Sequence, residues 1–164
     1  MINDTENLRL DRRTAFTGIG AGLALAFSTQ TKAAGPEAVP ALEVEKENIV
    51  NDFCAAWATR DADQLASYLS DDIEYHMFEG RPPINGVAEF SAQLKPFMAG
   101  MAEIDWEMLR SSVMGDIVIN ERIDHFIRAE GSNAPDNHFH VVGVFLVRGG
   151  KIVYWKDYNL SGEL

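Results

Sequence analysis

Two short motifs in the second half of the chain carry residues that could act together on a substrate. In the first, NERID, Arg122 and Asp124 stand two residues apart in a segment otherwise rich in isoleucine, valine and phenylalanine. In the second, VYWKDY, Asp157 follows Trp155 by two residues. Side chains two positions apart leave a β-strand on the same face, so both motifs predict charged groups on otherwise apolar strand faces.

Charges on an apolar face are costly to bury unless they are paired, which predicts that these groups meet one another. Two carboxyl groups that share a cavity cannot both ionise cheaply, so they share a proton. Arg122 between them would hold both and stabilise the remaining negative charge. Tyr75, on an earlier predicted strand next to a loop, would add a phenol to the same cavity. The alternative is a structural ion-pair network that closes the sheet, with Tyr75 as a core residue.

The elements that must position these residues follow from the spacing of apolar side chains. Spacings of three and four residues predict three helices, which begin at residue 43, after a break at 60–63, and at residue 87. Strands are predicted over residues 73–78, 103–113, 117–129, 137–148 and 151–160, the last two joined by a Gly149-Gly150 turn. This order, ααβαββββ, is α+β: a strongly curved mixed or antiparallel sheet wraps over three helices as a cone, whose apolar mouth suits a ligand.

The composition limits the partners of the chain. Its 164 residues suffice for one domain, and a net charge of −11 argues against a nucleic acid or an anionic membrane as the partner. The single cysteine, Cys54, excludes an intrachain disulfide, and we expect it to be buried in an apolar helix. No residues have the spacing of a metal site or of a phosphate-binding loop, so neither a metal nor an organic cofactor is expected.

The first part of the chain differs in character from the rest. Arg12 and Arg13 precede a small-residue apolar run over residues 15–27. This order is typical of an export signal, and the run is too short for a bilayer span of ~20 helical residues. Twin arginines resemble the leaders of the bacterial twin-arginine pathway, which implies a periplasmic or secreted protein; a disordered or mitochondrial-type leader is the alternative. Three segments are therefore predicted: an export signal over residues 1–34, a linker over 35–42 and a domain over 43–164.

The order of predicted elements resembles the nuclear transport factor 2-like, or SnoaL-like, fold. Within it, the motifs ERID, GVFLVRGGKIVYWKDY and EYHM resemble limonene-1,2-epoxide hydrolases over roughly residues 47–160. The resemblance implies a cofactor-free enzyme that opens a small or medium apolar epoxide to a vicinal diol. It also implies a homodimer that pairs through the outer face of the sheet.

The resemblance further implies a role for each reactive residue. Asp157 would be the base that activates water, and Asp124 would be the acid that protonates the oxirane oxygen. Arg122 would bridge the two carboxyl groups, and Tyr75 would hold the water. The reaction would be a single step in which no covalent ester forms.

One position departs from the resembled pattern. The second residue after Tyr75 is an asparagine in the family, where it also holds the water, but here it is Met77. Asn120, on the predicted face of Arg122, is a candidate to replace that contact. The other predicted pocket residues are expected to belong to the core first and to the cavity wall second: Phe126, Phe139, Val141 and Trp155.

Two other functions stay open at this point. A ketosteroid-isomerase-like or polyketide-cyclase-like enzyme could use the same fold, although that chemistry needs one base and an oxyanion hole rather than two braced carboxylates. A non-catalytic periplasmic binder of apolar small molecules is the other alternative, and Met77 favours it slightly.

Overall fold

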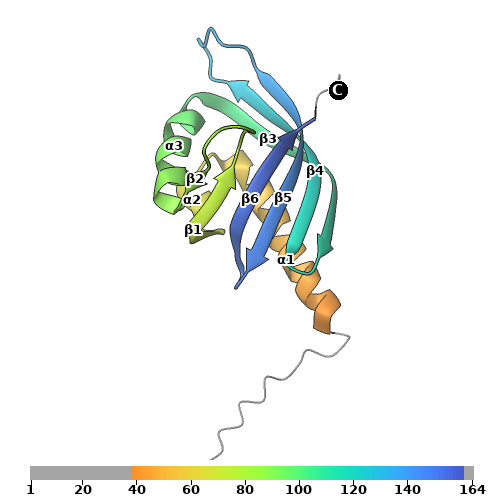
Figure 1. Ribbon diagram of the computed structural model, residues 1–164. Helices are drawn as coiled ribbons and strands as arrows, with labels where there is room; N and C mark the ends of the chain where they lie inside the picture. Colours follow the sequence, from red (N-terminus) through yellow and green to blue (C-terminus); the bar gives the residue numbers. More distant parts are fainter. Residues whose placement is uncertain (1–37, 161–164) are drawn as a thin grey trace, which may run out of the picture. The chain divides into compact units, whose positions relative to one another are not determined.

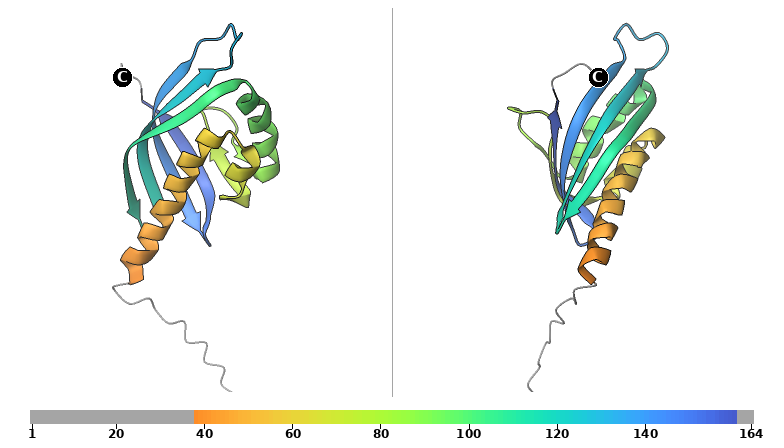
Figure 2. Two further views of the ribbon diagram at one scale, coloured as in Figure 1. Left: turned by 180° about the vertical axis from the view of Figure 1, so that it is seen from behind. Right: turned by 90° about the vertical axis from the view of Figure 1, so that its right-hand side faces the viewer.

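The computed structural model describes residues 38–160, in which helices cover one face of a six-stranded sheet (Figure 1, Figure 2). The helices are α1 (Ala38–Ala56), the short 3-10 helix η1 (Trp57–Thr59), α2 (Ala62–Ala66) and α3 (Val87–Ala99). The strands are β1 (Leu69–His76), β2 (Ile84–Asn85), β3 (Met101–Met114), β4 (Ile117–Arg128), β5 (Asn137–Arg148) and β6 (Lys151–Asn159). The predicted α+β class is confirmed.

The strands lie in the order β2-β1-β6-β5-β4-β3. Strands β3 to β6 form an antiparallel meander, whereas β1 pairs in parallel with β6, so the sheet is mixed. The parallel pair sets Tyr75 opposite Trp155, although the two residues are far apart in the sequence. The last strand consequently lies inside the sheet, beside the strand that carries the predicted phenol.

Aromatic rings fill the space between α1 and the sheet. Phe53 of α1 is fully buried and meets the rings of Trp155 and Trp106 nearly edge-on, at centroid separations of 5.2 and 6.4 Å. Alternate residues of β4 point into the same space, as the period of a strand requires. Arg122 and Asp124 belong to this inward set, so the charged motif does lie on the buried face of the sheet.

The N-terminal end of the domain differs from the prediction. The linker predicted over residues 35–42 is wrong in part, because α1 already begins at Ala38. Pro40 stands in the first turn of that helix, where the N–H groups have no partner within the helix and a proline is tolerated. The export signal predicted over residues 1–34 lies outside the described residues. None of the described helices is long and apolar enough to cross a membrane.

Strand β1 begins earlier than the strand predicted over residues 73–78, at the expense of the second helix. Asp61 caps α2 as predicted, because its carboxylate accepts hydrogen bonds from two N–H groups of the first turn. Leu69, however, already pairs with Ile152 of β6. Backbone pairing with a strand from the other end of the chain therefore extends β1, and local residue spacing carries no sign of it.

Candidate active site

Arg122 lies at the centre of the predicted site and is fully buried, with 0% of its surface exposed. Its Nε donates to Oδ1 of Asp124 at 2.7 Å, and its Nη2 donates to Oδ2 of the same carboxylate at 3.2 Å. Nη2 also donates to Oδ1 of Asp157 at 2.9 Å. The structure thus brings together the two carboxyl groups and the guanidinium that the two motifs predicted.

The register of the sheet places these groups side by side. Strand β5 separates β4 from β6, and its inward positions next to the ion cluster are occupied by Val141, opposite Arg122, and by Gly143, opposite Asp157. A Cβ atom at Gly143 would clash with Nη1 of Arg122 and would lie 2.7 Å from Oδ1 of Asn120. The missing side chain of this glycine is therefore what lets the arginine reach across β5 to the second carboxylate.

Neutral groups complete the surroundings of the guanidinium. Nη1 of Arg122 donates to Oδ1 of Asn120 at 2.9 Å, and Nδ2 of Asn120 donates to Sγ of Cys54 at 3.3 Å. The ring of Trp106 lies against the guanidinium, with 4.2 Å between Cζ and the ring centroid. These contacts fix the plane of the guanidinium, so both carboxyl groups are presented in one orientation.

Asp157 has further hydrogen-bond donors besides the arginine. Nε1 of Trp155 donates to Oδ1 at 2.8 Å, and the hydroxyl of Tyr75 donates to Oδ2 at 3.3 Å. The rings of Tyr75 and Trp155 stack with 3.6 Å between their centroids, a consequence of the parallel pairing of β1 with β6. Oδ2 is therefore the oxygen of Asp157 that the arginine leaves free for other chemistry.

Burial dominates the protonation of this cluster. It raises the pKa of Asp124 to about 7, although Arg122 acts in the opposite direction. Burial likewise raises the pKa of Asp157, against the lowering effect of Arg122 and the donors from Trp155 and Tyr75. Burial and the charge of Asp157 also raise the pKa of Tyr75 well above its usual value, so the phenol stays a hydrogen-bond donor. Two carboxyl groups with raised pKa values around one cation are suited to hold one proton between them.

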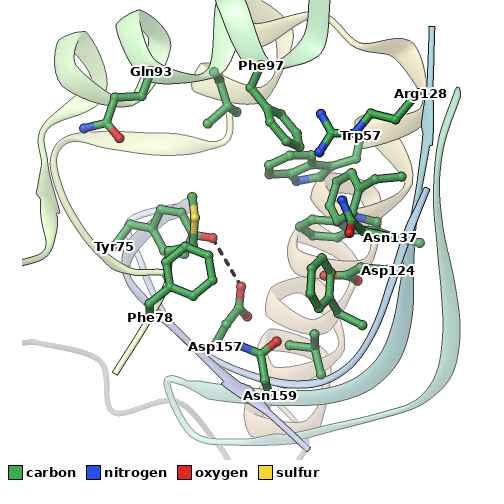
Figure 3. A pocket seen from close by; sticks show the side chains of 16 residues that line it. Trp57, Tyr75, Phe78, Gln93, Phe97, Asp124, Arg128, Asn137, Asp157 and Asn159 are labelled. Carbon is green, nitrogen blue, oxygen red and sulfur yellow. Dashed lines mark hydrogen bonds between the residues drawn. The ribbon is translucent and has the colours of Figure 1, made fainter. Parts of the chain in front are cut away.

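A cavity of about 380 Å³ opens beside the two carboxyl groups, within the usual size range of small-molecule sites (Figure 3). Asp124 and Asp157 face it from β4 and β6, and Tyr75 faces it from β1. The rest of its wall is mostly aromatic and aliphatic. Among the residues predicted for the wall, those that line the cavity are Met77, Phe126, Phe139 and Val141.

Two residues predicted for the pocket lie elsewhere. Trp155 is fully buried in the core and acts on the site only through its N–H group, which holds Asp157. Asn120 lies behind Arg122 and does not line the cavity, because its amide is occupied by the guanidinium and by Cys54. The replacement of the family's asparagine by Asn120 is therefore not supported.

Several residues that line the cavity were not predicted. Asn159 follows Asp157 by two residues, and Arg128 follows Asp124 by four, so the same period-two argument could have found both. The other unpredicted residues come from helices, turns and neighbouring strands whose packing the spacing does not reveal: Trp57, Phe78, Gln93, Leu94, Phe97, Trp106 and Asn137. Within residues 38–160, no three histidine, cysteine or carboxylate side chains gather in a way that could hold a metal ion.

Comparison with known proteins identifies the family. The model of the SnoaL-like domain matches residues 50–155. The chain belongs to the SnoaL-like domain family. A solved epoxide hydrolase from M. tuberculosis, of the type related to limonene-1,2-epoxide hydrolase, is 28% identical to this SnoaL-like domain, with a TM-score of 0.63 over 73% of this chain and 85% of that one.

More distant structures share the fold alone. A proposed polyketide cyclase from Xanthomonas campestris is 20% identical, with a TM-score of 0.60 over 71% of this chain and 90% of that one. A protein with a ketosteroid-isomerase-like fold from Catenulispora acidiphila is 19% identical, with a TM-score of 0.59 over 67% of this chain and 83% of that one. The nuclear transport factor 2-like fold predicted for this SnoaL-like domain is thereby confirmed.

The close approach at Gly143 gives a testable consequence. Gly143→Ala should destabilise the fold by about 1–3 kcal/mol, because the added methyl group must displace Arg122, Asn120 and the ring of Phe145 in a packed interior. Gly100→Ala is the matched control, since a Cβ there meets only the carbonyl oxygens of Phe97 and Pro96, at ordinary distances of 3.5 and 4.0 Å. Urea unfolding measures both. Equal stability of the two variants would show that the arginine does not need the space above Gly143.

Proposed function

We propose that this SnoaL-like domain is a cofactor-free epoxide hydrolase of the limonene-1,2-epoxide hydrolase type, which opens a small or medium apolar epoxide to a vicinal diol. One observation carries the proposal. Two buried carboxyl groups, bridged by one buried arginine, face an apolar cavity from neighbouring parts of the sheet. The relative from M. tuberculosis, which is an epoxide hydrolase of this type, supports the same assignment.

The proposed reaction uses the two carboxyl groups in one step. A water molecule held between Tyr75 and Oδ2 of Asp157 gives a proton to Asp157 while its oxygen attacks an epoxide carbon. The carbon–oxygen bond of the ring breaks, and the released oxygen takes the proton of Asp124. Asp157 then carries the proton that Asp124 has lost, and transfer of that proton within the pair bridged by Arg122 restores the starting state.

The departure at Met77 affects how the water is held. A missing polar contact is worth roughly 1–3 kcal/mol, which corresponds to about ten- to a hundredfold in rate. Asn159 is the candidate replacement, because its amide and the carboxylate of Asp157 point into the same end of the cavity (Figure 3). We propose that Asn159 of β6 makes the hydrogen bond to water that an asparagine at the position of Met77 makes in the limonene-1,2-epoxide hydrolase family.

The second candidate function is a proton-shuttling enzyme of the ketosteroid isomerase or polyketide cyclase kind, which the shared fold of distant structures keeps open. Such chemistry has no need for a second carboxyl group on the same arginine. Incubation with a panel of epoxides and with a Δ5-3-ketosteroid separates the alternatives. Diol formation is the expected result. Isomerisation without diol formation would favour the second function. If neither product forms, a non-catalytic binding protein is favoured.

The proposed roles of Asp124 and Asp157 predict losses that do not add. Asp124→Asn and Asp157→Asn should each reduce diol formation by about 10²–10⁴-fold, because acid and base act in the same transition state. The double variant should be scarcely worse than the poorer single variant, since groups that act as a unit lose activity non-additively. Arg122→Lys should also lose diol formation, because an ammonium group cannot bridge both carboxyl groups as a planar guanidinium does.

The controls are milder changes at the same water site. Tyr75→Phe and Asn159→Ala should each cost only about one hydrogen bond, roughly tenfold. Circular dichroism checks that every variant is folded. A folded Asp157→Asn variant with nearly full turnover would mean that Asp157 is not the base.

The protonation of the pair predicts the pH dependence of the reaction. The acid must be protonated, and burial raises the pKa of Asp124 to about 7, so kcat should fall as the pH rises above about 7. The base must be ionised, so kcat should also fall at low pH, and this limb should lie above the usual carboxylate range because burial raises the pKa of Asp157. A pH–rate profile measures both limbs. A rate that keeps rising through pH 8 would contradict the role of Asp124.

We also propose that the protein is exported and pairs as a homodimer through the face of the sheet opposite the helices. The export proposal rests on Arg12, Arg13 and the apolar run that follows them. Replacement of both arginines with lysine should trap an uncleaved precursor in the cytoplasm, as detected by fractionation and blotting. Unchanged export of that variant would contradict the twin-arginine route, and a monomeric mass in analytical ultracentrifugation would contradict the dimer.

A further inference from the structure

The cavity has a second charged end, formed by Arg128. This residue is the last of β4 and points to the same side of the sheet as Phe126 and Asp124, which precede it by two and four positions. It is half-buried, and it is the one basic side chain among the described residues that line the cavity. Figure 3 shows its side chain on the far side of the cavity from Asp157.

Within the described part of the chain, no carboxylate forms an ion pair with the guanidinium of Arg128. Its Nε makes only a long hydrogen bond, at 3.4 Å, to the carbonyl oxygen of Pro135. The neighbouring acid, Asp136, accepts instead from the backbone N–H of Arg128, at 2.8 Å. Arg110 and Arg148 pair with carboxylates on the surface. Arg60 donates to the carbonyl oxygen of Met101 and Arg81 lies over the ring of Phe78, and neither residue lines this cavity. In a chain with a net charge of −11, a cation at a cavity wall without an acidic partner is available to a ligand.

The two charged ends are separated by an apolar stretch. Arg128 follows Asp124 by four positions, which corresponds to about 13 Å along β4. Phe126 lies between the two ends along β4, with its ring 5.3 Å from that of Phe97 of α3, and Asn137 of β5 is the register partner of Phe126. The amide of Asn137 faces the cavity between Arg128 and Asp124 (Figure 3). The cavity therefore has an acid–base end, an aromatic middle and a cationic end.

We infer that the ligand of this cavity is an amphipathic carboxylate, whose carboxylate binds Arg128 and whose apolar chain lies over the aromatic rings. A planar guanidinium matches a carboxylate with two parallel hydrogen bonds, and the amide of Asn137 can add a third. At the opposite end, Arg122 is already paired with Asp124 and Asp157 and is not available to a ligand, so the position of Arg128 orients the molecule. The choice of substrate rests on the proposed hydrolase activity. With that activity, the substrate is a medium-chain epoxy acid whose epoxide is remote from its carboxylate.

Binding tests the anion site without any reliance on catalysis. Decanoate and decanol serve as probes, and the fluorescence of Trp57 and Trp106, which line the cavity, reports their binding. Decanoate should bind about tenfold or more tightly than decanol, because a charge-assisted hydrogen bond exceeds a neutral one. Arg128→Gln should abolish this preference and Arg128→Lys should retain part of it. Arg148→Gln, the same change of charge at an exposed site, should leave the preference intact.

Catalysis then tests the substrate class. The ratio of kcat/KM for 9,10-epoxydecanoic acid over its methyl ester should exceed one and should fall about tenfold or more in Arg128→Gln, with Arg148→Gln as the control. If decanoate binding depends on Arg128 but neither epoxide is hydrolysed, the proposed function is contradicted and the anion site is supported. Hydrolysis of both epoxides with a ratio unaffected by Arg128→Gln, or equal binding of decanoate and decanol, would overturn the anion site alone.

Discussion

The site depends on the burial of one positive charge. A fully buried guanidinium is tolerated only when its desolvation is offset by ionic and hydrogen-bonded partners, and removal of one partner from such a cluster is strongly destabilising. Arg122 meets this requirement with Asp124, Asp157 and Asn120. Burial by itself would lower the pKa of Arg122, but the charges of Asp157 and Asp124 raise it instead, so the group stays charged.

The same constraint accounts for the proposed chemistry. One cation can neutralise one carboxylate, so the second carboxyl group of a buried pair is stabilised by a proton. A cluster that is neutral overall then contains both a proton acceptor and a proton donor, each facing the cavity. This is the combination that water attack on an epoxide needs, and it arises from the requirement to bury Arg122 without leaving a net charge in the core.

Several features of the sheet follow from this arrangement. Gly143 on β5 has to lack a side chain, because the arginine crosses above it to reach β6. The parallel pairing of β1 with β6 brings Tyr75 onto Trp155 and thereby onto Asp157. On the helix side, α1 meets the cluster with the uncharged Cys54, whose Sγ accepts a hydrogen bond from Asn120.

Part of the site could be predicted from the sequence, and the rest could not for physical reasons. Period-two spacing was enough to put Arg122 and Asp124 on one buried face and to turn Asp157 inward, and the loop after its strand placed Tyr75 near the same cavity. The resemblance added the role of each residue. The roles of Trp155 as a donor to Asp157 and of Asn120 as a support behind the arginine depend on rotamers and on cross-strand register, which spacing does not encode. The early start of β1 depends likewise on pairing with a distant strand.

The central claim is that water attacks the epoxide directly, with Asp157 as base and no bond to the protein. A single turnover in ¹⁸O-labelled water, with enzyme in excess over epoxide, followed by mass spectrometry of the diol and of the peptide that contains Asp157, tests it most directly. The account predicts one labelled oxygen in the diol of the first turnover and none in the peptide. Label in the carboxylate of Asp157, with an unlabelled first diol, would contradict it.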